Sequence, residues 1–312
     1  MMATYTHTPV MLERSIELLG PALAKPGSLL VDATVGLGGH AEAFLRAFPA
    51  LSLLGIDRDP AALALSAERL APFGDRVRLR QARFDEVGTL LDEEFPGRAP
   101  QAFLFDLGVS SLHLDDATRG FSYRQDADLD MRMNPDDDLS ASDIVNDWTV
   151  PELADIFRTY GDEPLAGRYA RAIVEARPIR TTGELVSVID RATPAGAPKR
   201  GHRAKRVFQA LRIAVNAELE AFRRALPEAL DRLAEGGRIV ILSYHSGEDR
   251  IAKHLIHART VSTTPVGLPV IAKDDQPEFR WVVRGPEYAS DSEVAENSRS
   301  QSVRLRAAEK RG

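Results

Sequence analysis

The feature that most constrains the fold is a glycine-rich turn in the stretch LLVDATVGLGGH, residues 29–40. Residues 28–32 are predicted to form a buried strand that ends in the carboxylate of Asp32, because a short apolar run between turn signals is typical of a strand. Residues 39–48 then have helical spacing. A strand, a glycine-rich turn and a helix begin a nucleotide-binding βαβ unit, in which the missing Cβ atoms let a ligand approach the backbone. The glycines of the turn are Gly36, Gly38 and Gly39.

A second strand is predicted over residues 51–57, and it ends in Asp57. This acid follows Gly36 at about the 20-residue spacing expected of a carboxylate that binds ribose hydroxyls. Residues 36–41 also fit G-x-G-x-x-A, the fingerprint of dinucleotide-binding dehydrogenases. The turn therefore indicates a nucleotide-like cofactor without deciding which one.

Strands and helices continue to alternate up to Asp106. A helix capped by Asp59 and Pro60 is followed by strands over residues 76–80 and 101–106. Alternation of this kind is typical of an α/β fold, a parallel sheet with helices on both faces. Ligands bind at the carboxyl edge of such sheets. We therefore expect the residues at or just after the strand ends to converge there, namely Asp32, Asp57, Phe84 and Asp106.

The alternation stops after Asp106 and resumes near residue 206. Residues 112–205 are predicted to be a helical insertion, which leaves a discontinuous domain of residues 1–111 and 206–312. After the insertion we expect one long helix ending at Gly236 and a buried strand over residues 238–244 with His245 at its end. The segments FRWVV and VRLRA are predicted to pair as an antiparallel hairpin, with Arg304 and Arg306 on its exposed face.

Composition limits the class of protein. The chain has 312 residues, 44% of them hydrophobic and 28% charged, as in soluble globular proteins. It has no cysteine, which excludes disulfides and thiolate chemistry, and no apolar run approaches the length that spans a bilayer. With no signal peptide recognisable, we expect a cytoplasmic protein.

The net charge of −6 means that a nucleic-acid site would need a local basic patch. The one strongly basic run lies at the end of the insertion and includes Arg203, Lys205 and Arg206. It is either a solvated surface or a set of phosphate contacts that position an RNA.

Residues 126–137 lack the glycine and glutamate of a calcium loop, so no metal site is predicted. The G-x-S-x-G motif of a hydrolase is also absent around Ser110.

The assembled motifs resemble the bacterial small-subunit ribosomal RNA (cytosine-N4)-methyltransferase family (methyltransferase H) over nearly the whole chain. The matching runs are HTPVML, DATVGLGGH, GIDRDP, DLGVSS, RGFSY, LDMRMNP, RVFQALRIAVNAELE, GGRIVILSYHSGEDR and VAENSRS. The resemblance implies a class I, Rossmann-like S-adenosylmethionine-dependent methyltransferase domain with an inserted helical domain that recognises RNA. The implied substrate is a cytosine in the decoding region of 16S ribosomal RNA, methylated on its exocyclic N4. The expected partner is this RNA within the small ribosomal subunit. A homodimer is compatible with the sequence.

The resemblance also implies site residues. Its cofactor contacts fall on Gly38, Gly39, His40, Asp57, Phe84, Asp106 and His113. Asp106 is the first candidate to accept the proton of the cytosine amine, and the weaker candidates for orienting the base are Ser110, Ser111 and His245. The chain departs from the usual family pattern at Leu112, His113, Ser298 and Gln301.

Two other functions remain open on sequence grounds. One is a nicotinamide-dependent dehydrogenase that uses the same G-x-G-x-x-A turn. The other is an RNA-binding ribosome assembly factor whose nucleotide fold has lost activity. Binding of S-adenosylmethionine separates the methyltransferase from the dehydrogenase, and turnover separates it from the assembly factor.

Overall fold

The computed structural model describes residues 8–110, 112–113, 116–196, 202–262 and 276–312. The chain divides into two compact units. The sheet unit comprises Met1–Gly108 and Glu220–Gly312, and the helical unit comprises Val109–Leu219. The helical insertion expected over residues 112–205 lies within the helical unit, which extends further at both ends.

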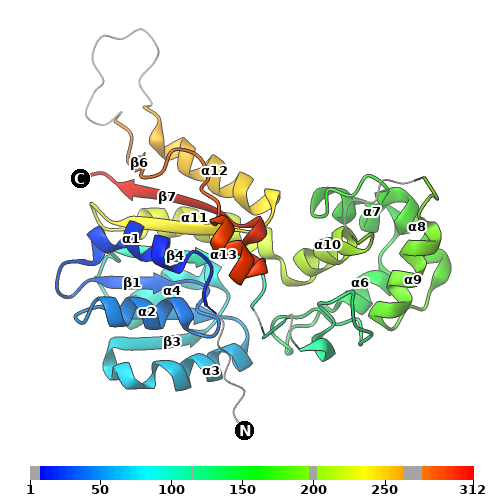
Figure 1. Ribbon diagram of the computed structural model, residues 1–312, viewed down its shortest axis with the longest axis horizontal. Helices are drawn as coiled ribbons and strands as arrows, with labels where there is room; N and C mark the ends of the chain where they lie inside the picture. Colours follow the sequence, from blue (N-terminus) through cyan, green and yellow to red (C-terminus); the bar gives the residue numbers. More distant parts are fainter. Residues whose placement is uncertain (1–7, 111, 114–115, 197–201, 263–275) are drawn as a thin grey trace. The chain divides into compact units, whose positions relative to one another are not determined.

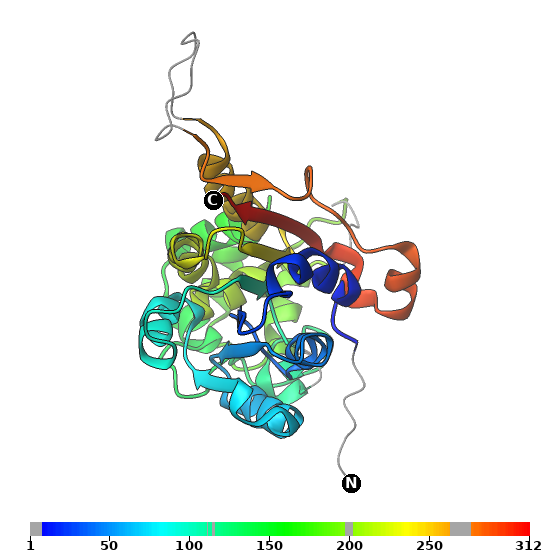
Figure 2. The same ribbon diagram turned by 90° about the vertical axis from the view of Figure 1, so that its left-hand side faces the viewer.

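A seven-stranded sheet forms the centre of the sheet unit (Figures 1 and 2), with the order β3-β2-β1-β4-β5-β7-β6. The first five strands in this order are parallel, and β7 runs antiparallel to both of its neighbours. The predicted α/β fold is confirmed, as is the terminal antiparallel pair. The strands are β1 (Leu29–Asp32), β2 (Ser52–Asp57), β3 (Val77–Gln81), β4 (Ala102–Asp106), β5 (Arg238–Ser243), β6 (Phe279–Trp281) and β7 (Arg304–Lys310).

Helices cover both faces of the sheet because side chains alternate between the two faces along each strand. One face carries α1 (Leu12–Leu23), α2 (Gly39–Ala47) and α3 (Pro60–Leu70). Phe44 of α2 and Leu19 of α1 share an apolar cluster with Leu30, Leu104 and Leu242 of the strands. This cluster fixes α2, and with it the glycine turn, against the sheet.

The opposite face carries α4 (Val87–Glu94), α11 (Glu218–Arg232) and α12 (Ser246–Thr260). Phe105 of β4 meets Phe222 of α11 edge to face, with 5.6 Å between the ring centroids. Such pairs are favoured by the ring quadrupole in addition to the apolar area that they bury. A short helix, α13 (Asp291–Glu296), precedes β7.

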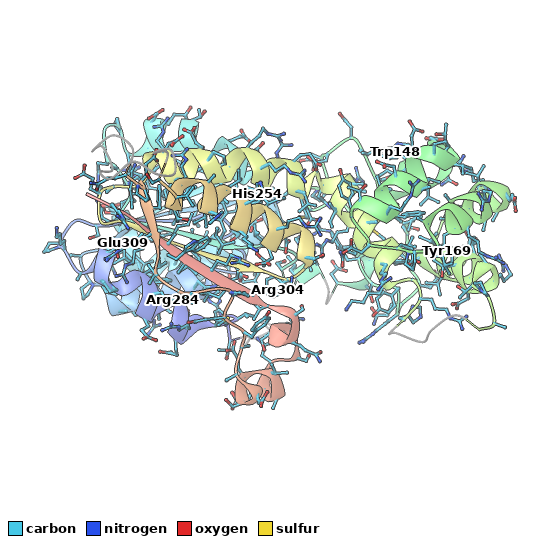
Figure 3. The ribbon with its side chains drawn as sticks, turned by 90° about the horizontal axis from the view of Figure 1, so that it is seen from above. Trp148, Tyr169, His254, Arg284, Arg304 and Glu309 are labelled. Atoms are coloured by element: carbon cyan, nitrogen blue, oxygen red, sulfur yellow. The ribbon has the colours of Figure 1, made fainter. Side chains whose placement is uncertain are left out.

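Glu309 of β7, which Figure 3 labels, forms ion pairs that hold the antiparallel edge of the sheet. Glu309 of β7 accepts hydrogen bonds from Arg238 on β5 at 2.9 Å and from Arg280 on β6 at 3.1 Å. The expectation that Arg306 lies on an exposed face is wrong, since only 5% of this residue is exposed. Its guanidinium donates two hydrogen bonds to Asp249 of α12, because α12 covers that face of β7.

The helical unit has its own apolar core, which contains Phe157, Ile173 and Leu211. One helix was expected from residue 206 to residue 236, but the structure breaks it at Ala217, whose φ of 48° ends α10. Asn216 is buried beside this break, and its amide bonds the backbone of Met131 and Met133. The helices are α6 (Ala141–Asp147), α7 (Val150–Thr159), α8 (Ala166–Ala176), α9 (Thr182–Ala192) and α10 (Lys205–Asn216).

Over the parts of the chain that the structure describes, none of the helices combines the length and the apolar character required to cross a bilayer.

Candidate functional site

The strands β1, β2 and β4 end in Asp32, Asp57 and Asp106, and the parallel register brings these ends to one edge of the sheet. Charge on Asp57 and on Asp106 acts on Asp32, which shows that the three carboxyl groups lie close enough to interact. The structure therefore brings together the carboxylates that the strand pattern predicted to converge.

Asp57 holds two turns at once. Its Oδ2 atom accepts a hydrogen bond from the backbone N–H of Gly36 at 2.9 Å. Its Oδ1 atom accepts one from the N–H of Asp59 at 2.9 Å, at the start of α3. A carboxylate has about four lone-pair positions and can accept several hydrogen bonds at once, as binding of ribose hydroxyls requires. The ribose-binding role of Asp57 stays a prediction.

The glycine turn adopts backbone angles that favour glycine. Gly36 and Gly38 have φ values of 51° and 76°. Gly39 has ordinary angles, but a Cβ there would lie 2.6 Å from Cγ of Pro9. These glycines are required by the shape of the turn itself, and Gly38 is the residue from which α2 begins.

His40 is buried on the first turn of α2, with 6% of the residue exposed. Its Nε2 atom lies 3.1 Å from the carbonyl oxygen of Val10, to which it can donate. Its Nδ1 atom lies 3.7 Å from Oδ2 of Asp106. Burial lowers the pKa of His40, which favours the neutral ring. Its position joins the segment before α1 to the carboxylate edge of the sheet.

Asp106 is held by groups from two other elements. Its backbone N–H donates to Oγ1 of Thr34 at 2.7 Å, just after β1. The hydroxyl of Tyr244, just after β5, donates to Oδ1 of Asp106 at 2.7 Å. Burial, together with the negative charge of Asp106, raises the pKa of Tyr244 well above its usual value. Sequence reasoning missed Tyr244, because the pairing of β5 with β4 cannot be read from the sequence.

Asp32 is the most deeply buried of the three acids, with 1% of the residue exposed. Burial raises its pKa to about 8, although the N–H of Thr34 donates to its Oδ1 atom. Asp32 is therefore mainly protonated at neutral pH. In this form it adds no negative charge to the carboxyl edge of the sheet.

Phe84 follows β3 and is half-buried. Its ring meets Phe105 edge to face at a centroid distance of 6.0 Å. Phe105 in turn packs against Phe222. The aromatic core of the sheet therefore supports Phe84, whose contact with a cofactor stays a prediction.

His245 lies at the start of α12 and caps it. Its Nδ1 atom accepts from the N–H of Gly247 at 3.1 Å, and its Nε2 atom lies 3.2 Å from Oε1 of Glu248. Glu248 also accepts from the N–H of Tyr244 at 2.7 Å. These contacts give His245 a structural role, and its predicted role in orienting a base remains without a supporting contact.

Three further predicted site residues, Ser110, Ser111 and His113, belong to the helical unit. His113 is buried and stacks on Phe121 at a centroid distance of 4.9 Å, and its Nδ1 atom accepts from the N–H of Ser110 at 3.2 Å. Ser111 lies outside the described residues. The contacts of Ser110 and His113 shape the start of this unit, and their roles toward cofactor or base stay predictions.

The predicted RNA contacts lie at the start of α10. Lys205 is exposed, whereas Arg203 and Arg206 are half-buried. Arg206 donates to the carbonyl oxygen of Asp162 at 3.0 Å. His202, which belongs to the same predicted basic run, stacks on Tyr123 with 4.4 Å between the ring centroids. An aromatic ring beside cationic side chains is a surface suited to RNA.

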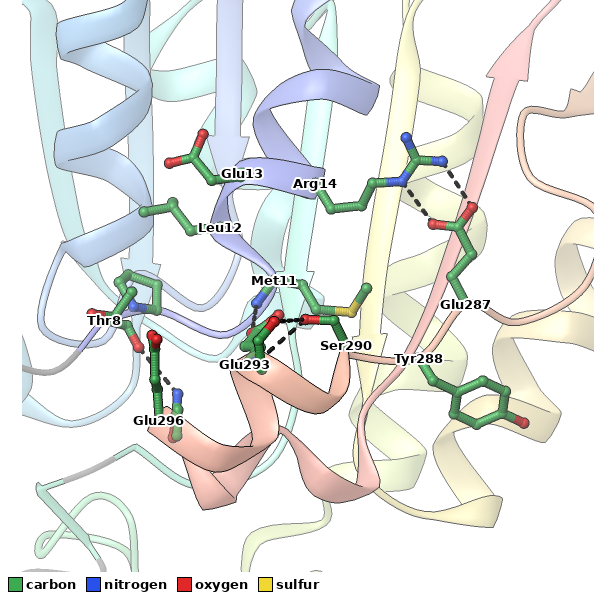
Figure 4. A pocket seen from close by; sticks show the side chains of 13 residues that line it. Thr8, Met11, Leu12, Glu13, Arg14, Glu287, Tyr288, Ser290, Glu293 and Glu296 are labelled. Carbon is green, nitrogen blue, oxygen red and sulfur yellow. Dashed lines mark hydrogen bonds and ion pairs between the residues drawn. The ribbon is translucent and has the colours of Figure 1, made fainter.

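A cavity of about 580 Å³ lies between α1 and α13 in the sheet unit (Figure 4). Arg14 is the single basic side chain among its lining residues, and it pairs with Glu287. The N–H of Met11 donates to Glu293 at 2.6 Å. The remaining glutamates in the lining are Glu13 and Glu296. Its acidic lining makes this cavity unsuitable for phosphate groups.

Comparison with known proteins decides the family. Residues 4–311 match the model of the MraW methylase family. The chain belongs to this family. The Ribosomal RNA small subunit methyltransferase H of Clavibacter michiganensis subsp. michiganensis (strain NCPPB 382) is 56% identical over 307 residues, covering 97% of this chain and 96% of that protein. The protein of the same name from Thermobifida fusca (strain YX) is 54% identical over 308 residues, covering 97% and 93%.

Similarity to solved structures is weaker. The crystal structure of an rRNA methylase from Streptococcus thermophilus has a TM-score of 0.44 and 15% sequence identity, covering 99% of this chain and 100% of that chain. A likeness of this size says nothing of activity, so family membership rests on the sequence matches alone.

The buried Asp32 makes stability depend on pH. Its pKa of about 8 in the folded protein exceeds the value of about 4 expected in the unfolded chain. The folded state therefore binds a proton that the unfolded state lacks between these pH values, and stability falls as pH rises through this window. Asp32→Asn keeps an acceptor for the N–H of Thr34 but carries no charge.

The quantity of interest is the unfolding free energy of Asp32→Asn minus that of the wild type. We expect this difference to increase by roughly 4 kcal/mol between pH 5 and pH 9. Denaturant unfolding at several pH values measures the difference. The exposed Asp75→Asn is the control and should track the wild type. A constant difference between Asp32→Asn and the wild type across this range would show that Asp32 is ionised in the folded protein.

Proposed function

We propose that this protein transfers a methyl group from S-adenosylmethionine to the exocyclic N4 of a cytosine in the decoding region of 16S ribosomal RNA. The observation that carries the proposal is the family match over residues 4–311, joined to relatives named Ribosomal RNA small subunit methyltransferase H that align over nearly their whole length. The cytoplasm and the small ribosomal subunit, as compartment and substrate context, belong to the same proposal.

The residues of the sheet unit suit this cofactor. The positive φ values of Gly36 and Gly38 form a turn that a ligand can approach closely. Asp57 offers acceptors for two ribose hydroxyls, and Phe84 offers an apolar ring for the adenine. The carboxylate of Asp106, which accepts a hydrogen bond from Tyr244, provides negative potential for a ligand that carries a positive charge.

The reaction needs one base. When bound, S-adenosylmethionine supplies an electrophilic methyl group on a positively charged sulfur. The cytosine amine is a poor nucleophile, because its lone pair is delocalised into the ring, and it must lose one proton as it gains the methyl group. Alignment of the two reacting atoms could supply roughly 7–11 kcal/mol of the barrier. An acceptor for the proton adds about 10²–10⁴-fold.

Asp106 is our candidate for this acceptor. It lies at the carboxyl edge of the sheet beside the glycine turn, and 25% of its side chain is exposed. The hydroxyl of Tyr244 donates to one of its oxygens, which favours the ionised form that can take a proton. The same position also lies among the cofactor contacts that the family resemblance implies.

The helical unit is our candidate for holding the RNA. Enzymes that act on a base favour splayed or single-stranded targets, because a stacked base hides its amine. Arg203, Lys205 and Arg206 would bind phosphates and position the strand without reading its sequence. In this arrangement the sheet unit binds the cofactor, and Ser110, Ser111 and His113 lie in the segment after the Asp106 strand.

The dehydrogenase alternative is not favoured. The classic dinucleotide-binding sheet is parallel with the order 3-2-1-4-5-6. Here an antiparallel strand, β7, is inserted between β5 and β6. Together with the family match, this difference favours the methyltransferase.

We expect Asp57→Ala to weaken binding of S-adenosylmethionine on the order of 100-fold, because hydrogen bonds from ribose to a carboxylate are charge-assisted. Isothermal titration calorimetry measures the affinity. Asp75→Ala changes an exposed residue of the short 3-10 helix before β3, in the same unit, and this matched control should bind normally. If a folded Asp57→Ala variant bound S-adenosylmethionine with unchanged affinity, the cofactor site would not include Asp57.

The double variant Lys205→Glu/Arg206→Glu should bind S-adenosylmethionine normally but bind RNA more weakly at low salt. Each lost phosphate contact lowers the slope of log affinity against log salt by about 0.7, so we expect a reduction of up to about 1.4. Arg171→Glu/Arg191→Glu, which changes two exposed arginines of α8 and α9, is the charge-matched control. Equal losses of RNA affinity in both double variants would mean that RNA binding depends on the net charge of the protein and not on Lys205 and Arg206.

A further inference from the structure

The hydrogen bond between Tyr244 and Asp106 has a consequence for the proposed reaction. The distance from the Tyr244 hydroxyl to Oδ1 of Asp106 is 2.7 Å, a short bond of the kind made to a charged acceptor. The carboxylate has no N–H or O–H of its own when ionised, so the phenol hydrogen is the donor. The bond therefore stabilises the ionised carboxylate and restricts its rotation.

Tyr244 is itself held in place. Its N–H donates to Glu248 at 2.7 Å, and it follows directly after β5, the strand paired with β4. Its ring lies against Gly108, where an added Cβ would be 3.4 Å from Cδ2 of the tyrosine. A Cβ at residue 108 would therefore be in van der Waals contact with the ring. These contacts aim the hydroxyl at Asp106 from a fixed position.

The second oxygen of Asp106 faces a different group. Oδ2 lies 3.7 Å from Nδ1 of His40, which is beyond the length of a hydrogen bond. His40 can donate from Nε2 to Val10, and this tautomer leaves Nδ1 without a hydrogen when the ring is neutral. The Tyr244 bond thus fixes Oδ1 of Asp106, and Oδ2 lies on the side of His40.

We propose that Tyr244 is a positioning residue for the methyl transfer, which sets the orientation and the ionised state of Asp106 so that Oδ2 can accept the proton of the cytosine amine. The inference rests on the proposed function, in which Asp106 is the proton acceptor. Tyr244 itself transfers no proton, because its pKa is raised further by burial and by the neighbouring carboxylate.

Other charged groups around this pair also affect its titration. Asp32 at the end of β1 and His40 on α2 act on Asp106 or share its surroundings. Glu248 of α12 and Glu293 of α13 add negative charge near Tyr244. All of them are present in both the wild type and Tyr244→Phe, so a difference between these two proteins reports the hydroxyl alone.

Tyr244→Phe is the decisive variant, since it removes one oxygen and keeps the ring. Loss of the donor should shift the titration of Asp106 upward by roughly one to two pH units. Carbon-13 NMR of carboxyl-labelled aspartate measures this shift without any turnover, and Asp106→Asn identifies the resonance. The acid limb of the pH profile of kcat should move by the same amount, while KM for the ribosomal substrate changes less than twofold.

Two controls separate positioning from a general loss of structure. Tyr288→Phe alters an exposed tyrosine of the same unit and should leave the titration and the profile unchanged. In the Asp106→Asn background, Tyr244→Phe should cause no further loss of kcat, because the group that it positions is gone.

The proposal would be overturned if Asp106 titrated at the same pH in Tyr244→Phe as in the wild type. It would also be overturned if Tyr244→Phe lowered kcat equally in the wild-type and Asp106→Asn backgrounds. Failure of the proposed function would look different. In that case the wild type would form no N4-methylcytidine, although the NMR shift caused by Tyr244→Phe would still be seen.

Discussion

The carboxylate of Asp57 is the constraint on which the rest of the site depends. It binds the N–H of Gly36 in one turn and the N–H of Asp59 in another, so the loops after β1 and β2 are fixed to each other. The apolar cluster that packs α2 on the sheet holds the far side of the glycine turn. The same carboxylate is the predicted ribose acceptor. The group that would recognise the cofactor therefore also builds the turn that receives it, and ligand recognition and loop geometry share one side chain.

The carboxyl edge of the sheet concentrates acidic groups and controls how many are charged. Burial leaves Asp32 mainly protonated at neutral pH, whereas Asp106 receives a hydrogen bond from Tyr244 that favours its ionised form. His40, buried beside Asp106, has a lowered pKa that favours the neutral ring. Two carboxyl groups at one edge of the sheet thus lie in different environments, one buried and the other hydrogen-bonded to a phenol hydroxyl. In the proposed reaction, this arrangement supplies one base beside a cofactor that carries positive charge.

Local patterns in the sequence were sufficient for the α/β fold and for the convergence of the strand ends, because strand length, turn glycines and helix spacing are local properties. They were insufficient where a distant element decides. Arg306 was predicted to be exposed because it alternates with apolar residues, but α12 covers that face and supplies Asp249 as its partner. The break at Ala217 is marked by neither glycine nor proline, and it lies beside Asn216, whose amide bonds the backbone of residues 131 and 133. Tyr244 was missed because its importance comes from the pairing of β4 with β5, which no local pattern reveals.

The central claim is tested most directly by methyl transfer from labelled S-adenosylmethionine to small ribosomal subunits that lack the modification, followed by nucleoside mass spectrometry of the RNA. Wild-type protein should produce N4-methylcytidine in 16S ribosomal RNA, and protein carrying Asp57→Ala should produce far less at the same cofactor concentration. Naked 16S ribosomal RNA in a parallel reaction shows whether the assembled subunit is required. Tight binding of S-adenosylmethionine with no methyl transfer to either substrate would contradict the account, because the cofactor site would then serve a different reaction.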